Sequence, residues 1–239
     1  MKMNKLSAIP KIILVVAVAL LFVAAMTLPA NADLTYYFGD YNMFGAPQAG
    51  GVAPSGTWAT ATFIDVSPDN VQLTLSVTNN ITSAENIGAF YFNYSGDQSG
   101  LMWTAVDTSA STPAIGTAGS YQADGDGLYD IVFNFPPPPG GSAKFQAGES
   151  VIYNISGTGL SASGFYELAT PGTSDVGPFY AVAKLGGIPC GDTSDPNCQQ
   201  GTTSAWSSGT IVPEPVSSTL FIVGACALGF RRFRKMKKA

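Results

Sequence analysis

The sequence predicts an all-β protein body, an antiparallel β-sandwich of the jelly-roll or immunoglobulin-like type, for three reasons. Apolar residues alternate with polar ones in residues 71–77, where Val, Leu, Leu and Val are separated by Gln, Thr and Ser. Such a strand buries one face and exposes the other. Clusters of Gly, Pro, Asn, Asp and Ser separate the apolar runs, as turns separate strands. No segment between residues 33 and 212 keeps a helical period.

Seven segments have the length and composition of strands. They are residues 58–66, 71–77, 87–94, 129–135, 151–156, 164–169 and 178–185. Asn79-Asn80 is expected to be a turn, and the four prolines of residues 136–139 predict a surface loop. The aromatic residues near the start are interpreted as a first strand that packs into the core, with a sugar-stacking surface as the alternative. They are Tyr36, Tyr37, Phe38, Tyr41 and Phe44.

The charge of the protein body is strongly acidic. All of the sixteen Asp and Glu residues except Glu214 lie in residues 33–212, against two lysines, Lys144 and Lys184. Such a surface keeps a domain soluble and repels nucleic acid, so no nucleic-acid partner is expected. The length suits a single core. We therefore expect one sandwich domain over residues 33–185 and a loop-rich tether over residues 186–211.

The first 32 residues have the composition of a secretory signal peptide. Three lysines precede an apolar stretch over residues 12–25, and the small residues Ala30 and Ala32 follow it. This order fits export through the general secretion machinery with cleavage between Ala32 and Asp33. The alternative is an uncleaved transmembrane helix, which the short apolar run and the cleavage site disfavour.

The last 28 residues, 212–239, have three parts in a fixed order. Pro213, Glu214 and Pro215 come first, and an apolar run over residues 216–230 follows. The run would cover about 22 Å of a hydrocarbon core about 30 Å thick, which is a marginal transmembrane helix. Six basic residues then favour the cytoplasmic side and predict a stop-transfer anchor with its amino-terminal end outside. They are Arg231, Arg232, Arg234, Lys235, Lys237 and Lys238.

This tail resembles the C-terminal sorting signal of the PEP-CTERM family, which are surface and matrix proteins of Gram-negative bacteria. Pro213, Glu214 and Pro215 match the signature tripeptide, and Gly224 and Gly229 fit its small-residue-rich span. The resemblance covers about a tenth of the chain. It implies an inner-membrane-anchored intermediate, recognition by the membrane-embedded enzyme exosortase, and delivery to the cell surface or the biofilm matrix. The alternative is an ordinary tail anchor.

Cys190 and Cys198 enclose seven residues, and the compartment implied by a signal peptide is oxidising. We therefore predict a disulfide between them. The alternative, a pair of metal ligands, lacks any partner thiol or histidine. Cys226 lies in the apolar run and is expected to be a small buried hydrophobe.

The chain contains no histidine. This excludes Ser-His-Asp and Cys-His nucleophiles, His-ligated zinc and histidine acid-base catalysis. A carboxylate pair could still hydrolyse glycosides, but the acidic residues are scattered and many stand in turn contexts, as Asp65, Asp69 and Asp97 do. We therefore expect no enzymatic activity and assign no catalytic residue.

One acidic cluster suggests a cofactor. Asp124, Asp126 and Asp130 are separated by glycines and short spacers, and hard oxygen ligands on a tight glycine turn suit Ca²⁺. Leu128 and Phe135 stand where an EF-hand loop would need ligands, so the match is loose. The alternative is a plain Asp-Gly hairpin turn.

The sequence thus predicts an exported, non-enzymatic protein with a structural or adhesive role at the cell surface or in the extracellular polysaccharide matrix. A calcium-assisted carbohydrate-binding module is the second hypothesis. A glycan-active hydrolase that uses a carboxylate pair is the third.

Overall fold

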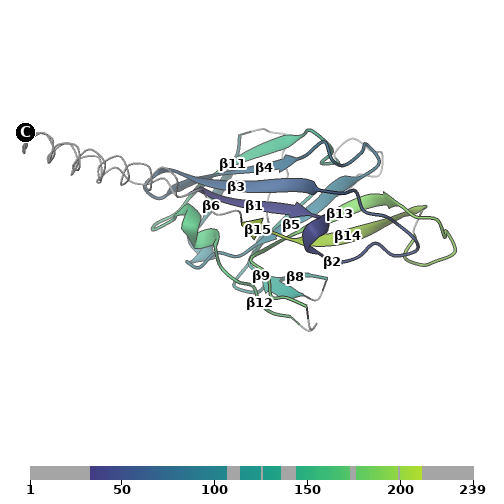
Figure 1. Cartoon of the computed structure of the whole chain (residues 1–239). Helices are drawn as coiled ribbons and strands as arrows, with labels where there is room; N and C mark the ends of the chain where they lie inside the picture. The colour runs from purple at the N-terminus through teal and green to yellow at the C-terminus, as the bar shows by residue number, and fades with distance from the viewer. Residues whose placement is uncertain are drawn as a thin grey trace, which may run out of the picture.

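The computed structural model describes residues 33–106, 114–124, 126–135, 144–172, 176–198 and 200–211. This part of the chain is an antiparallel all-β sandwich, as predicted (Figure 1). The first sheet has the order β15 (Thr210–Ile211), β1 (Asp33–Gly39), β3 (Thr57–Ser67), β4 (Asn70–Val77), β11 (Ser150–Ser156) and β6 (Met102–Ala105). The second has the order β2 (Met43–Gly45), β14 (Thr202–Ser208), β13 (Ala181–Pro189), β5 (Asn86–Phe92), β10 (Ile131–Asn134) and β7 (Ala114–Ile115).

A small third sheet lies on the side of the second sheet that faces away from the first (Figure 1). Its order is β12 (Thr170–Pro171), β9 (Gly127–Tyr129) and β8 (Tyr121–Ala123). Tyr129 of this sheet packs with Val182 of β13 in a second apolar cluster, separate from the main core. Three short 3-10 turns complete the elements: η1 (Asp40–Asn42), η2 (Gln98–Gly100) and η3 (Ala162–Phe165).

Strand β4 shows how alternation in the sequence produces the first sheet. Its four apolar residues are buried and the residues between them are half-exposed. Leu73 lies opposite Phe63 of β3 on one side and Tyr153 of β11 on the other. A shift of one residue would turn the apolar set to solvent, so burial fixes the register.

Aromatic rings fill the space between the two large sheets. Phe63 from the first sheet meets Phe92 from the second edge to face, with ring centroids 5.2 Å apart. Phe63 also stacks on Phe165 of η3 at 4.2 Å. Tyr36 of β1 lies 6.2 Å from Phe92. Such pairs contribute about 0.5–1.5 kcal/mol each beyond the burial of their area.

Most of the predicted strands are confirmed. Strands β3, β4, β5 and β11 cover residues 58–66, 71–77, 87–92 and 151–156 of the expected ranges. Asn79-Asn80 is a turn. Tyr36 and Phe38 are fully buried, so β1 is a core strand as predicted. Tyr41 is exposed instead, and Phe44 of β2 packs in the second apolar cluster. Residues 136–139, the expected proline loop, lie outside the described residues.

Two expected strands differ from the structure. Residues 164–169 contain no strand, because η3 ends in this segment and places Phe165 in the gap between the sheets. The expected strand over residues 129–135 is divided at Asp130 into β9 and β10, which belong to different sheets. Each strand is only three or four residues long.

Residues 186–211 also differ from the expected tether. Strand β13 continues to Pro189, and β14 pairs with it along its length. Ala205 and Ser207 of β14 are fully buried, and Ser207 Oγ accepts a hydrogen bond from Gly39 N at 2.9 Å. The sandwich therefore extends to Ile211, and only the loop between β13 and β14 is irregular.

We predict that Phe63→Ala lowers the free energy of unfolding by about 3–5 kcal/mol, because it leaves a cavity against Phe92 and Phe165. Chemical denaturation followed by near-ultraviolet circular dichroism measures the change. Val52→Ala is the control, since Val52 is 80% exposed and its removal should change stability by less than about 0.5 kcal/mol. Equal effects of the two substitutions would refute this description of the core.

Candidate functional site

The ends of the folded domain lie side by side. Strand β1 begins at Asp33, the residue that follows the predicted cleavage site, and β15 ends at Ile211. The two strands are antiparallel, with Tyr36 opposite Ile211 and Tyr37 opposite Thr210. The chain therefore leaves the sandwich at the same end at which β1 starts. We call this end the proximal end.

Gly209 lets the chain reach β1 from the second sheet. Its N–H donates to Ala181 O, which belongs to the second sheet, and the next residue already pairs with β1. A Cβ at this position would lie 2.8 Å from Tyr36 Cδ1 and 2.9 Å from Phe38 Cε1. A side chain here would thus collide with the buried rings of β1, so the crossing requires glycine.

The turn η3 closes the proximal end of the core. Tyr36 Oη donates to Phe165 O at 2.8 Å, and Ala162 N donates to Asp65 Oδ1 at 2.6 Å. Ser95 N donates to Gly164 O at 2.9 Å. Both large sheets therefore hold this turn in place. Contrary to the prediction from its sequence context, Asp65 therefore does not cap a local turn, but lies in β3 and accepts from a backbone N–H that is 97 residues away in the chain.

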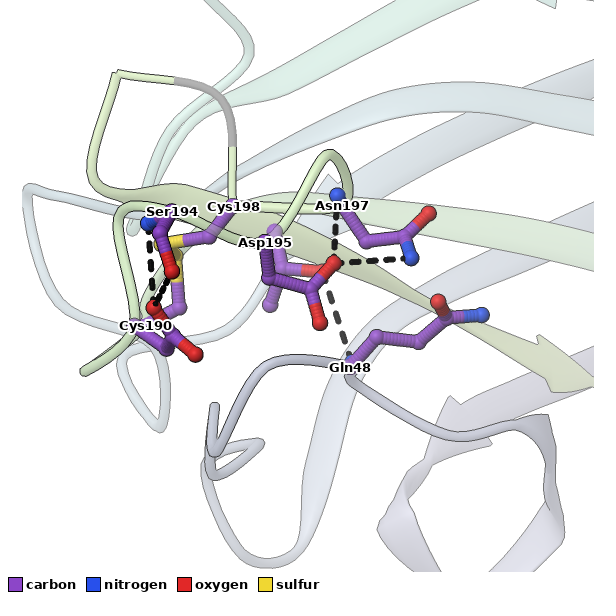
Figure 2. Close-up of a disulfide and its surroundings, with 8 residues drawn as sticks. Gln48, Cys190, Ser194, Asp195, Asn197 and Cys198 are labelled. Carbon is purple, nitrogen blue, oxygen red and sulfur yellow. Dashed lines mark hydrogen bonds between the residues drawn. A yellow bond between two sulfur atoms is a disulfide. The ribbon is translucent and has the colours of Figure 1, made fainter.

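The predicted disulfide between Cys190 and Cys198 is present (Figure 2). It closes the loop between β13 and β14, at the opposite end of these strands from the proximal end (Figure 1). Gly191 N donates to Ala49 O, which ties the loop to the segment before β3. Closing a loop of this size contributes about 2–3 kcal/mol by restricting the unfolded chain.

Carboxylates inside the disulfide loop bind its own backbone. Asp195 Oδ1 accepts from Asn197 N at 2.8 Å, as Figure 2 shows, and Asp192 Oδ1 accepts from Ser194 N at 3.0 Å. The hydrogen bonds from Ser194 lower the pKa of Asp192 below its usual value. These two carboxylates therefore serve to shape the turns.

Asp124, the first of the three predicted calcium ligands, begins the turn between β8 and β9. The strands form a hairpin in which Ala123 pairs with Gly127, and Asp126 N donates to Ala123 O at 3.0 Å. Asp124 itself has a left-handed backbone with φ of 43° and an exposed side chain. The turn thus belongs to a β-hairpin, which is the local geometry that the alternative interpretation expected.

Asp130 is a buried structural acceptor. Its Oδ2 accepts from Tyr94 N at 3.0 Å and from Gln98 Nε2 at 2.9 Å, and its Oδ1 accepts from Gly119 N at 2.8 Å. Three N–H donors therefore surround a carboxylate that is 5% exposed. This residue holds together three loops at the point where the chain passes from the third sheet to the second.

Asp126 lies deeper and is less completely satisfied. Its Oδ2 accepts from Tyr129 Oη at 2.8 Å, while its buried Oδ1 has no hydrogen-bond partner in the structure. Burial raises the pKa of Asp126 to about 6, and the hydrogen bond from Tyr129 offsets part of that effect. Burial together with the charge of Asp126 raises the pKa of Tyr129 and Tyr91.

The described residues contain no group of three His, Cys, Asp or Glu side chains that could hold a metal ion. Asp130 directs both oxygens to protein N–H groups. Calcium binding at Asp124, Asp126 and Asp130 stays a prediction, and the unpartnered Oδ1 of Asp126 is the observation in its favour.

Sequence reasoning missed the contact between Lys184 and Trp206 on the outer face of the second sheet. Lys184 Nζ lies 5.1 Å from the centre of the Trp206 ring, and the two residues are directly paired across β13 and β14. Tyr91 lies beside the same ring, at 5.9 Å. The alternation of residues 178–185 could have indicated the outward position of Lys184, but its partner stood in the expected tether.

The predicted processing residues at both ends lie outside the described residues, apart from Asp33. They are Ala30 and Ala32, the tripeptide Pro213, Glu214 and Pro215, and the basic residues Arg231, Arg232, Arg234, Lys235, Lys237 and Lys238. The described part of the chain contains no helix with the length and hydropathy to cross a membrane. Comparison with protein-family models, curated proteins and solved structures finds no match.

We predict that the stability of the protein falls as the pH rises from about 4 to about 6. The pKa of Asp126 is about 6 in the folded protein and 3.8 ordinarily, so the folded state holds more protons in this window. Across this window, the shift of Asp126 lowers the free energy of unfolding by about 2–3 kcal/mol. Thermal unfolding across this range should show the slope in the wild type and in the exposed control Glu167→Gln. The slope should be smaller in Asp126→Asn, where only the burial of Asp124 still raises a carboxyl pKa in this hairpin. A slope in Asp126→Asn equal to that of the wild type would contradict the assignment of the pH dependence to Asp126.

Proposed function

We propose that this chain is an exported, non-enzymatic protein of the cell surface or the extracellular polysaccharide matrix. Its C-terminal Pro-Glu-Pro motif, transmembrane helix and basic tail would direct it to an exosortase-type sorting enzyme. The observation that carries the proposal is the extent of the folded domain. Its strands begin at Asp33 and end at Ile211, so the sandwich lies between the two segments that the sequence assigns to export and sorting.

The disulfide supports export. Structural disulfides form and persist in the periplasm and outside the cell, and they are rare in the reducing cytosol. The bond between Cys190 and Cys198 cross-links the loop that joins β13 to β14. A reducing compartment would leave that loop without its cross-link.

The position of the two chain ends supports anchoring. Both lie at the proximal end, while the disulfide loop lies at the opposite end of β13 and β14. A helix over residues 216–230, stopped by the basic tail, would hold the sandwich outside the inner membrane before sorting. The disulfide loop would then point away from the membrane.

A structural or adhesive role completes the proposal. The acidic sandwich contains long-range aromatic packing, which suits a rigid component of a surface or matrix. The jelly-roll or immunoglobulin-like topology stays a prediction. The carbohydrate-binding module also stays a prediction, and thermal stabilisation by calcium that Asp126→Asn abolishes would support it. No described observation favours the hydrolase.

We predict that the native host releases the wild-type protein to the surface or medium without its tail. The variant Pro213→Ala, Glu214→Ala, Pro215→Ala should stay in the inner membrane with residues 216–239, because the sorting enzyme no longer recognises it. Cell fractionation and intact mass of both proteins test this. The triple variant keeps the apolar run and the six basic residues, so it changes the tripeptide without changing the expected anchor. If both the wild type and the triple variant stay full-length in the membrane, the protein is a simple anchored domain and the sorting proposal is wrong.

A further inference from the structure

The sandwich must lie very close to the membrane if the apolar run over residues 216–230 spans it, an assumption that rests on the proposed function. Strand β15 ends at Ile211, so only residues 212–215 separate the sheet from that run. Four residues reach at most about 14 Å when fully extended. The expected 26-residue tether would have let the domain move freely, but the structure places residues 186–189 and 202–208 in the second sheet and Thr210–Ile211 in the first.

The proximal end of the sandwich therefore faces the bilayer. Strand pairing defines which residues lie there. Asp33 of β1 pairs with Ile64 of β3, and β15 runs antiparallel to β1, toward this end. The last row of the first sheet joins Ser67, Asn70, Ser156 and Met102 across four strands.

Large exposed apolar side chains gather at this end. Met102 at the start of β6 is 68% exposed, and Val66 near the end of β3 is 54% exposed. Tyr166 and Leu168 follow η3, which is attached to β1 through Tyr36. They are 49% and 44% exposed. Half of the large exposed apolar residues of the described chain thus lie on the one end that the anchor would bring to the bilayer.

Tyr166 also carries an aromatic partner. Its ring stacks on that of Tyr180 with centroids 4.2 Å apart, and Tyr180 directly precedes β13. Tyrosine rings have an apolar body and a polar tip, and they are enriched where the acyl chains of a bilayer meet the headgroups. The pair thus has the chemistry of a membrane-interface contact.

The charges at this end determine which lipid surface fits. Asp65 lies near the end of β3, Asp69 and Asp97 lie outside the strands at this end, and Glu167 lies between the two exposed apolar residues after η3. Both lysines of the described chain are elsewhere. Lys184 pairs with Trp206 within the second sheet, and Lys144 precedes Phe145, which bridges Ile87 near the far end of β5. Anionic headgroups would be repelled, so the fitting surface is zwitterionic.

We propose that the proximal end of the sandwich is a membrane-contact surface, on which Met102, Val66, Tyr166 and Leu168 rest against the outer face of a zwitterionic bilayer. The short segment after Ile211 delivers this surface to the lipid. The domain then stands on its end, with the disulfide loop pointing away from the bilayer.

The test uses the full chain. Cys190 and Cys198 form the disulfide, so the substitution Cys226→Ser removes the remaining free thiol. Single cysteines at Leu168 or Met102 receive a nitroxide label, and the protein is reconstituted into phosphatidylcholine vesicles. Val52→Cys is the matched control, because Val52 is an exposed apolar residue in the loop before β3. Collision rates with lipid-soluble oxygen and with a water-soluble nickel chelate are measured at each site.

We expect labels at residues 168 and 102 to collide more with oxygen and less with the nickel chelate than the label at residue 52. Adding phosphatidylglycerol should reduce the difference. Flotation of the same vesicles separates the two ways in which the idea can fail. Protein that floats with the vesicles but exposes all three labels equally to water overturns the contact surface and leaves the anchor intact, with a protein partner or a second copy as the occupant of this end. Protein that does not float overturns both.

Discussion

The pairing of β15 with β1 is the constraint on which the whole arrangement depends. It brings the last described residues of the chain back to the first strand, across the two sheets and over the buried rings of Tyr36 and Phe38. Because Gly209 makes that crossing possible, β13 and β14 can belong to the second sheet while β15 closes the edge of the first. The pairing also places the start and the end of the domain together. The proposed contact with the bilayer depends on that position.

The strands with clear alternation could be predicted from the sequence, and the reason is local. In β4 the apolar residues point inward in an unbroken series, so the pattern and the burial agree. Strand β14 shows why the tether was expected instead. Its sequence is Thr-Thr-Ser-Ala-Trp-Ser-Ser, and its inward positions near the end are Ala205 and Ser207. Alanine and serine at these positions do not produce the alternation of large apolar residues that predicts a strand. The hydroxyl of Ser207 instead exchanges hydrogen bonds with the backbone of Gly39, so long-range hydrogen bonding decides the structure of this strand.

The acidic cluster shows a similar limit. Asp126 and Asp130 are four residues apart and looked equivalent as oxygen ligands, but the fold gives them different surroundings. Asp130 meets N–H groups from residues 94, 98 and 119, whereas Asp126 meets a tyrosine hydroxyl and leaves one oxygen unpartnered. The partners of Asp130 lie 11 to 36 residues away in the chain, so the spacing of the acidic residues could not reveal them. The disulfide was predictable because its two cysteines are close in the chain and chemically specific.

The central claim is that residues 186–211 belong to the sandwich, since a free tether there would remove the reason for the domain to lie on the membrane. The most direct measurement is the thermal unfolding of two exported fragments, residues 33–185 and 33–211, both followed by near-ultraviolet circular dichroism. We expect one cooperative transition for residues 33–211 and none for residues 33–185, which lose β14, β15 and part of β13. A cooperative transition at the same temperature in both fragments would contradict it, because residues 186–211 would then contribute nothing to the fold.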